Sequence, residues 1–207
     1  MILSVLAIMI SYLLGSISFS VLIAKGIKGI DIRDHGSGNA GATNTLRVLG
    51  KGPAICVLLL DALKGVAAVW IGVGLNASPD YWVPALCGLA AILGHNWPIY
   101  FNFRGGKGIA TTIGVLATLC LVPALLAGVF AILAIVFTRY VSLGSLIFVT
   151  LTPVVLLIMG YTTPIVVASI VIWALAVWRH RANIGRIVKG TESKLGSKAS
   201  KGGTGVV

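Results

Sequence analysis

Long apolar runs are the feature that most constrains what this chain can fold into. They cover residues 2–24, 53–75, 82–100, 109–138, 141–159 and 164–178. A helix needs about 20 mostly apolar residues to cross a bilayer, and several runs reach that length. The 207-residue chain is 57% hydrophobic and 10% charged, and its mean hydropathy is +1.02. This composition excludes a water-soluble globule and predicts an all-α integral membrane protein.

The distribution of basic residues indicates how many spans the chain makes. The run 109–138 is either one long helix or two short helices hinged near Pro123. With two helices the chain has seven spans, and one side of the membrane collects 15 of the 16 Lys and Arg residues. With one helix, Arg139 and the basic C-terminal segment move to the other side. Because basic loops favour the cytoplasm, we predict a seven-transmembrane-helix bundle with its N-terminus outside and its C-terminus cytoplasmic.

The same basic residues bear on partners and domain organisation. The formal net charge of +11 could indicate nucleic acid. The bases flank the apolar runs, however, so we expect them to orient the chain in the membrane and predict no nucleic-acid partner. Residues 1–195 are predicted to form one membrane-embedded domain, followed by a low-complexity, disordered tail at 196–207. The long polar segments fall on the cytoplasmic side, where we expect any chemistry to occur.

The first polar segment is DIRDHGSGNAGATNTLRVLGKG, residues 31–52. Its closely spaced glycines exclude an ordinary helix interior, and short polar side chains alternate with them. Such a loop either caps a helix end or grips a polar ligand with backbone and side-chain donors. Arg47 favours the second interpretation, since it lies one helical turn after Thr43 and can share its face.

The second polar segment is GHNWPIYFNFRGGKGIATT, residues 94–112. Gly105, Gly106, Lys107 and Gly108 precede small, helix-starting residues, which places backbone N–H groups, a helix N-terminus and one cation together. This pattern predicts an anion site. It is not a Walker A loop, because Phe101 stands at the first glycine position and no Ser or Thr follows the lysine.

The third polar segment is WRHRANIGRIVKGTE, residues 178–192. It follows helical spacing after the last span, and His180 and Asn183 share one face at i,i+3. It is either a basic stop attracted to anionic lipids or part of a functional site. Within a span, Asp61 and Lys64 also lie at i,i+3, which indicates an ion pair that braces the bundle or floors a polar cavity.

The chain offers donors and cations rather than a recognisable covalent or metal centre. No Cys–His, Ser–His–Asp or metal cluster has convincing spacing, so we predict no metal and no cofactor. The His-x4-Asp pattern of soluble-type glycerolipid acyltransferases is missing as well. The remaining inventory suits binding a phosphate-bearing substrate and stabilising charge in a transition state.

Three long motifs resemble those of one membrane enzyme family. GSGNAGATNTLR (36–47), GHNWPIYFNFRGGKGIAT (94–111) and RHRANIGRIVKGTE (179–192) are similar, in order, to the motifs of the bacterial acyl-phosphate:glycerol-3-phosphate acyltransferases, the PlsY family. The segment RYVSLGS (139–145) resembles that family too. The resemblance implies a seven-helix enzyme of the bacterial inner membrane. It would transfer an acyl group from acyl phosphate to the sn-1 hydroxyl of glycerol 3-phosphate, giving lysophosphatidic acid and phosphate in the first step of phospholipid synthesis.

The resemblance also implies roles for particular residues. Motif positions make five residues catalytic candidates: Ser37, Arg47, Lys107, His180 and Asn183. Seven more are expected to bind substrate: Asn39, Thr43, Asn44, Gly105, Gly106, Gly108 and Ser142. Glu192 matches a glutamate with a structural role, and we assign Asp61 and Lys64 to structure as well. Membrane lipids are the other expected partners, and a monomer is expected to suffice.

Several points stay open at the level of sequence. The base is either His180 or the phosphate of glycerol 3-phosphate itself, and the sequence does not tell which loop holds which phosphate. The rival interpretation is an anion carrier whose basic loops line an entry route. Against it, the polar groups crowd one face, and the two halves of the chain contain no matching broken helices.

Overall fold

The computed structural model describes residues 2–75 and 80–196, and every regular element in these ranges is helical. The predicted all-α class is therefore confirmed. The predicted tail beyond Gly196 lies outside the described residues. In chain order the elements are α1 (Ile2–Gly15), α2 (Phe19–Lys28), η1 (Ile32–Asp34), α3 (Ala42–Leu49), α4 (Lys51–Leu75), α5 (Trp82–Asn96), η2 (Ile99–Phe101), α6 (Ile109–Leu119), α7 (Leu121–Thr138), α8 (Val141–Ile158), α9 (Thr163–Arg179) and α10 (Arg181–Val188).

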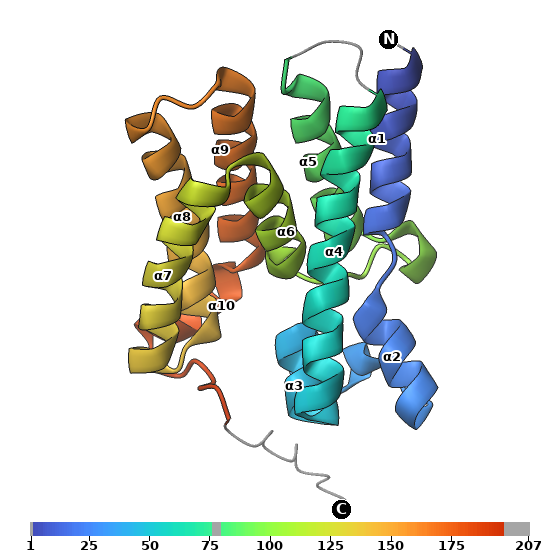
Figure 1. The fold of residues 1–207 in the computed structure, drawn as a ribbon. Coiled ribbons are helices and arrows are strands. Elements are labelled where there is room, and N and C mark those ends of the chain that lie inside the picture. The colour runs from blue at the N-terminus through green and yellow to red at the C-terminus, as the bar shows by residue number, and fades with distance from the viewer. Residues whose placement is uncertain (1, 76–79, 197–207) are drawn as a thin grey trace, which may run out of the picture.

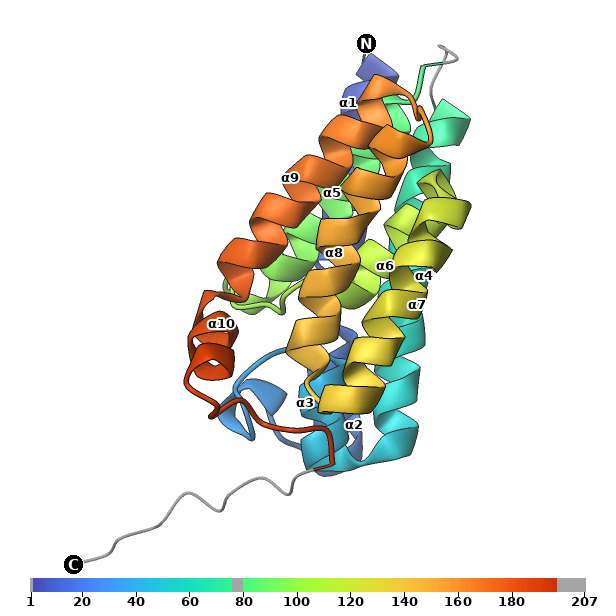
Figure 2. The same cartoon turned by 90° about the vertical axis from the view of Figure 1, so that its left-hand side faces the viewer.

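The long helices form two groups that the short helix α6 joins. Figure 1 shows α1, α4 and α5 together on one side and α7, α8 and α9 on the other, with α6 between them. Within the first group α1 packs on α5, and α4 packs on α5 and α6; within the second, α8 packs on α7 and α9. The helices α2, α3 and α10 lie at the same end of the molecule, away from the N-terminus (Figures 1 and 2).

Close helix contacts depend on small residues where α4 meets α6. A Cβ atom added to Gly114 of α6 would lie 1.9 Å from the carbonyl oxygen of Ala62 in α4. A Cβ atom added to Gly65 would lie 2.3 Å from the carbonyl oxygen of Thr111. The two backbones therefore approach as closely as small residues permit, which is typical of helix packing in membranes.

The apolar run 2–24 is interrupted in the structure. α1 ends at Gly15, Ser18 is extended with φ −95° and ψ 91°, and α2 begins at Phe19. Two side chains bond backbone carbonyls beside the break. Ser16 Oγ donates to the Tyr12 carbonyl, as serine often does against a helix backbone. Lys64 Nζ donates to the Ile17 carbonyl at 2.7 Å, so this oxygen is occupied by a side chain.

The expected division of the run 109–138 into two helices is present. α6 ends at Leu119 and α7 begins at Leu121, and Cys120 between them has φ −154° and ψ 68°. Pro123, near which we expected the hinge, lies in the first turn of α7. A proline is tolerated there because its missing N–H would have no helical partner anyway. α6 is thus only 11 residues long.

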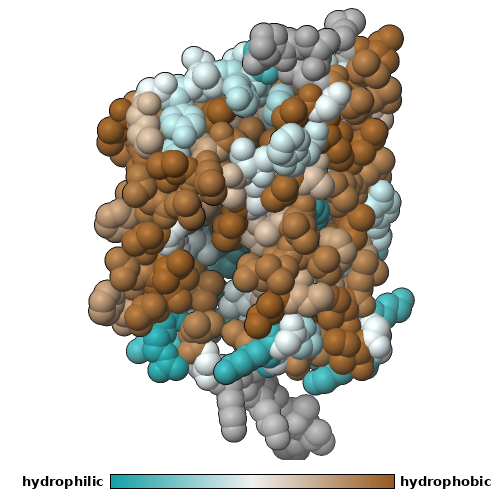
Figure 3. All heavy atoms as spheres, viewed as in Figure 1, coloured by the Kyte–Doolittle hydropathy of each residue, from teal (hydrophilic) through white to brown (hydrophobic). Residues whose placement is uncertain are grey.

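Several helices are long and apolar enough to cross a membrane. Among the described residues, four stretches pass on length and composition: Ile2–Lys28, Lys51–Leu75, Leu121–Thr138 and Val141–Ile158. The pair α9 and α10, bent by 61° at His180, would add a fifth. Large exposed apolar side chains follow one another on α7, including Phe130, Ile132 and Phe137. Figure 3 shows this apolar surface as a broad band, with hydrophilic residues gathered along its lower edge.

Candidate active site

The glycine loop, residues 105–108, lies deep in the bundle because the helix that follows it is short. α6 occupies only part of the height of its neighbour α4, and the loop enters α6 near the middle of that height (Figures 1 and 2). Gly108, the N-cap of α6, has φ +82°, a left-handed conformation that glycine adopts without strain. The loop therefore brings the positive end of a helix dipole to the protein interior.

Gly106 is required by close packing on two sides. A Cβ atom there would lie 2.2 Å from Nε2 of His95 and 2.3 Å from the carbonyl oxygen of Ala40. The backbone N–H of Gly106 donates to the His95 carbonyl at 3.1 Å. The loop is thus held between the end of α5 and the segment before α3, and this packing accounts for the glycine independently of any ligand.

Lys107 joins the glycine loop to the third polar segment. Its Nζ donates to Oδ1 of Asn183 in α10. Asn183 Nδ2 in turn donates to Glu192 Oε1 at 2.6 Å. The two predicted catalytic residues Lys107 and Asn183, 76 positions apart in the chain, are therefore in direct contact.

Glu192 is the acceptor at the centre of this network. Besides Asn183, Ser142 Oγ donates to Oε1 at 2.7 Å and Arg186 Nε donates to Oε2 at 2.7 Å. These hydrogen bonds hold the pKa of Glu192 below its ordinary value against the opposing effect of burial. The carboxylate therefore fixes α10 and the start of α8 to the C-terminal segment. The hydroxyl proton of Ser142 is already donated to Glu192, so Ser142 could contact a substrate only by accepting a hydrogen bond through its oxygen.

Lys107 carries a destabilised positive charge. Burial lowers its pKa to about 8, and the neighbouring Arg47, Arg179 and Arg186 act in the same direction, while Glu192 opposes them. Four cations with one carboxylate among them leave an excess of positive charge at this point. An arriving phosphate would compensate it, which is the electrostatic requirement for an anion site.

His180 lies at the junction of α9 and α10 and is 2% exposed. Its Nδ1 lies 2.8 Å from the Ala176 carbonyl, which can only accept, so Nδ1 carries the proton and Nε2 is an acceptor. Burial, with a smaller contribution from Lys107, lowers the pKa of His180 to about 4. The ring is therefore neutral and offers a lone pair to a hydroxyl group.

The segment 31–41 is held in shape by Asn44. Its Nδ2 donates to the carbonyls of Ile32 and His35 at 3.0 and 2.9 Å, and its Oδ1 accepts from the backbone N–H of Ser37 at 2.8 Å. Asn44, expected from the motif to bind substrate, thus has all its polar atoms engaged within the loop. This geometry favours a role in shaping the loop.

Other side chains of the first motif remain available for a ligand. Within the described ranges, the side chains of Ser37, Asn39, Thr43 and Arg47 make no hydrogen bond or ion pair. Ser37 is exposed, whereas the other three are half-buried. The positive charge of Arg47 contributes to lowering the pKa of Lys107. Arg47 is therefore an uncompensated cation close to the glycine loop.

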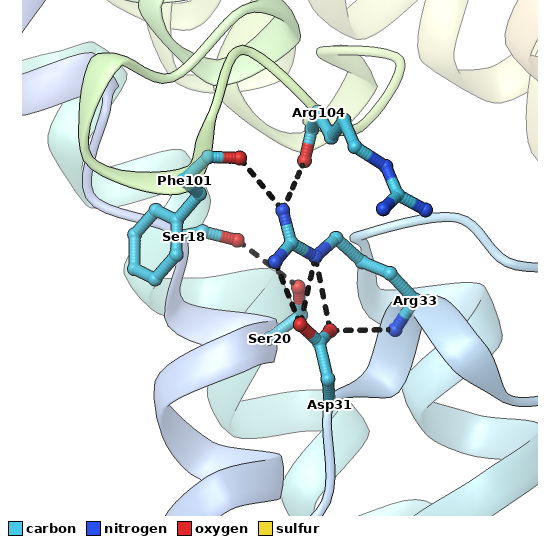
Figure 4. Close-up of polar contacts among 6 residues, drawn as sticks. All are labelled: Ser18, Ser20, Asp31, Arg33, Phe101 and Arg104. Carbon is cyan, nitrogen blue, oxygen red and sulfur yellow. Dashed lines mark hydrogen bonds and ion pairs between the residues drawn. The ribbon is translucent and has the colours of Figure 1, made fainter.

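Arg33 fastens the first polar segment to the second. Its guanidinium donates through Nε and Nη2 to Asp31, with an ion pair of 2.6 Å, and through Nη1 to the carbonyls of Phe101 and Arg104 at 2.7 and 3.1 Å (Figure 4). Asp31 accordingly has a lowered pKa, chiefly because of its hydrogen bonds to Arg33. Sequence reasoning assigned no role to this arginine, because its carbonyl partners are 68 and 71 positions away.

Arg179 is a second residue that sequence reasoning missed. Its Nη2 donates to the carbonyls of Gly105 and Gly106, and its guanidinium lies over the Trp97 ring at 5.4 Å from the centroid. It thus turns the carbonyls of Gly105 and Gly106 towards α9, while the N–H of Gly106 is engaged with the His95 carbonyl. Its place in the third motif was the available signal, but the partners lie in the second.

The face formed by α4, α6 and α7 is hollowed below α6. Figure 3 shows a recess there with hydrophilic atoms at its floor and apolar side chains on both walls. The ribbon in the same view has α7 and α10 on one side of this position and α4 and α3 on the other (Figure 1). A recess of this kind gives polar residues of the interior an opening to the apolar surface of the molecule.

Comparison with known proteins identifies the family. A family model described as glycerol-3-phosphate acyltransferase matches residues 5–190. The chain belongs to the glycerol-3-phosphate acyltransferase family. The resemblance inferred from the three motifs is thereby confirmed. As a member of this family the protein is an enzyme, and its predicted class, an acyltransferase of glycerol 3-phosphate, is confirmed with it.

The relatives of this acyltransferase cover nearly its whole length. Glycerol-3-phosphate acyltransferases of Shouchella clausii and Halalkalibacterium halodurans are each 62% identical to it, over 96% and 91% of this chain and 99% and 93% of theirs. A crystal structure of PlsY (YgiH), an integral membrane glycerol 3-phosphate acyltransferase, in its glycerol 3-phosphate form has a TM-score of 0.88 at 40% identity, covering 93% of this chain and 96% of that one. The lysophosphatidic acid form has a TM-score of 0.83 at 38% identity, covering 92% and 94%. The protein is accordingly a multi-pass membrane protein.

Proposed function

We propose that this enzyme transfers an acyl group from acyl phosphate to the sn-1 hydroxyl of glycerol 3-phosphate. The observation that carries the proposal is the contact of Lys107 with Asn183 beside the uncompensated Arg47, at the start of α6, the helix below which the surface is hollowed (Figure 3). Two phosphate-bearing substrates, one with a long acyl chain, match a cationic site that opens towards lipid. The relatives' glycerol 3-phosphate and lysophosphatidic acid forms support the acceptor and the product.

Little covalent chemistry is needed for such a donor. Acyl phosphate is a mixed anhydride, so phosphate is already a good leaving group. The acceptor hydroxyl oxygen forms a bond to the acyl carbon, and the bond from that carbon to the phosphate oxygen breaks. The enzyme has to align the two anions and stabilise charge on the carbonyl oxygen and the departing phosphate. Arg47, Lys107 and the N–H groups of the glycine loop other than that of Gly106 supply that charge stabilisation, with Ser37, Asn39 and Thr43 as further hydrogen-bonding partners.

His180 orients the acceptor in this scheme. Its Nε2 lone pair accepts a hydrogen bond from the attacking hydroxyl, while Nδ1 is held by Ala176. A pKa of about 4 makes His180 a weak base, which favours transfer of the hydroxyl proton to a substrate phosphate. Asn183 and Glu192 act by holding Lys107 in position.

The proposal extends to the arrangement in the membrane. We infer seven spans, formed by α1 with α2, then α4, α5, α6, α7, α8 and α9, and a site that faces the cytoplasm of a bacterial inner membrane. The basic residues at the end of the molecule that holds α2, α3 and α10 support this orientation. Residues 1–195 act as one domain, and one copy contains every residue assigned to the site.

A transfer assay tests the function. Purified protein in detergent micelles is expected to release phosphate from acyl phosphate only when glycerol 3-phosphate is present, with lysophosphatidic acid formed in equal amount. Lys107→Ala is expected to lose most turnover, by about a hundredfold or more, because a preorganised cation is removed from the transition state. Near-normal turnover of a folded Lys107→Ala protein would refute the assigned site. Flux of phosphate into liposomes without chemistry would instead favour the anion carrier.

A further inference from the structure

A buried polar cluster lies directly behind the glycine loop. It consists of Asp61 and Lys64 in α4 and His95 in α5, which are 1%, 3% and 6% exposed. Lys64 Nζ lies 2.8 Å from Asp61 Oδ1, and it donates to His95 Nδ1 at 3.0 Å and to the Ile17 carbonyl at 2.7 Å. Buried ionisable groups are costly in a membrane protein and usually serve a function. The expected ion pair of Asp61 and Lys64 is present, and His95 joins it as a third residue.

The hydrogen bonds determine which nitrogen of His95 carries the proton. Nδ1 of His95 lies 3.0 Å from Lys64 Nζ and 3.5 Å from Asp61 Oδ1. A charged Lys64 can only donate, so with Lys64 charged Nδ1 accepts from it and the ring proton lies on Nε2. Within the part of the chain that the structure describes, Nε2 of His95 has no hydrogen-bond partner. It faces the two loops of the site, since a Cβ atom on Gly106 would lie 2.2 Å from it and 2.3 Å from the Ala40 carbonyl. The cluster thus presents an unused donor between the first motif and the glycine loop.

The same cluster is tied to the break in the first helix. Lys64 donates a hydrogen bond to the Ile17 carbonyl within that break. Two further hydrogen bonds join the end of α1 to residues 97–104, the segment before the glycine loop. Tyr12 donates from its hydroxyl to the Trp97 carbonyl at 2.8 Å, and the backbone N–H of Ile99 donates to Ser16 Oγ at 3.4 Å. Irregular backbone at membrane depth needs such partners, because lipid supplies none. The cluster is therefore the fixed point against which the glycine loop rests.

We propose that Asp61, Lys64 and His95 form a positioning device for the glycine loop, rather than a brace for the bundle. Lys64 fixes the ring and tautomer of His95, and the ring in turn fixes Gly106 and the adjacent Lys107. All three are positioning residues that act through the loop on a bound phosphate. The inference deepens the proposed function and rests on it for the identity of the two ligands.

A paired apolar replacement separates the two roles. Exchanging a buried ion pair for apolar residues of similar volume is often neutral for stability. If Asp61 and Lys64 only held α4 in the bundle, Asp61→Leu combined with Lys64→Met would therefore leave ligand binding unchanged. The Ile17 carbonyl loses its partner in the double variant, so we expect this variant to fold with a somewhat lower thermal midpoint than the unchanged protein. Its dissociation constant for glycerol 3-phosphate, or for an acyl phosphonate that mimics the donor, is expected to rise by about tenfold or more, because the loop is misplaced. Calorimetry on purified full-length protein in micelles measures both constants.

A second variant covers the case in which the double variant does not fold. His95→Phe keeps an aromatic ring against Gly106 but removes both nitrogens, and we expect it to weaken binding of the same ligand to a similar extent. Thr152→Val is the matched control, because Thr152 is equally buried and its side chain donates to the Phe148 carbonyl of its own helix, α8. Its dissociation constants are expected to match those of the unchanged protein.

The outcomes are distinct. A rise in the dissociation constant of one ligand in folded His95→Phe, without a rise in Thr152→Val, supports the positioning role. Constants within about twofold of the unchanged protein for both ligands would overturn it. The binding measurement needs no turnover. An unchanged protein that binds glycerol 3-phosphate but transfers nothing from acyl phosphate would therefore refute the proposed donor and leave the positioning result standing on its own.

Discussion

At the scale of single residues, the buried charge of Lys107 destabilises the free protein but favours the binding of an anion. Burial lowers the pKa of Lys107 to about 8 from an ordinary value of 10.5. A shift of this size means that the charged, buried ammonium lowers the free energy of unfolding by roughly 3 kcal/mol at neutral pH. The cost is fully present below about pH 8 and fades as the pH rises towards 10.5. Bound phosphate removes it by supplying the missing negative charge.

This charge predicts an alkaline limit to activity. Because Lys107 loses its proton above about pH 8, kcat/KM is expected to fall at higher pH. The substrate phosphates are already fully ionised there and contribute no change. Lys107→Arg remains charged, so its lower activity is expected to stay constant over the same range. Initial rates between about pH 7 and pH 10 measure both profiles, and a flat profile for the unchanged protein would contradict the assignment.

At the scale of elements, the glycine loop is determined by what packs against it. Gly105 and Gly106 lie against the end of α5, and a Cβ atom on either would collide with backbone atoms of other segments. Glu192 plays the corresponding part on the opposite side by accepting from α8 and from α10. Lys107 is positioned between two rigid supports, as a preorganised catalytic group has to be.

A pair of glycine substitutions tests this view. Gly106→Ala is expected to destabilise the protein by about 1–3 kcal/mol through overpacking and to abolish substrate binding. Gly128→Ala in α7 is the control, because a Cβ atom there meets nothing within 4 Å. It is expected to be neutral or to stabilise by up to about 1 kcal/mol. Thermal unfolding in micelles provides the comparison, and equal midpoints for the two variants would disprove the packing argument.

At the scale of the whole molecule, the arrangement places every assigned residue towards one end of the bundle or at its middle. The break between α1 and α2 and the short helix α6 both lie part-way along the height of the bundle (Figure 1). We propose that the substrates reach the site from two directions, glycerol 3-phosphate from water and acyl phosphate from the lipid side. This arrangement depends on the proposed orientation.

Thiol labelling tests that orientation. In a variant without native cysteines, Tyr81→Cys is expected to react with a membrane-impermeant reagent on the outer side of the inner membrane. Lys189→Cys is expected to react only after the membrane is opened, because the positive-inside rule places α10 in the cytoplasm. Both positions are exposed, so access to the thiol itself is matched. The reverse pattern would invert the proposed topology.

The sequence by itself determined the membrane class, the division of the run 109–138 and the family, because apolar length, charge and long motifs are local properties of the chain. It also indicated Lys107 and Asn183 as site residues. Only the tertiary structure brought these two into contact, broke the first helix at Ser18, and assigned Arg33, Arg179 and His95 to the loops that they hold. Their partners are backbone carbonyls, neighbouring ring nitrogens and close-packed glycines far along the chain. Such contacts leave no pattern in a single sequence, because any residue can offer a carbonyl and only the fold decides which one is near.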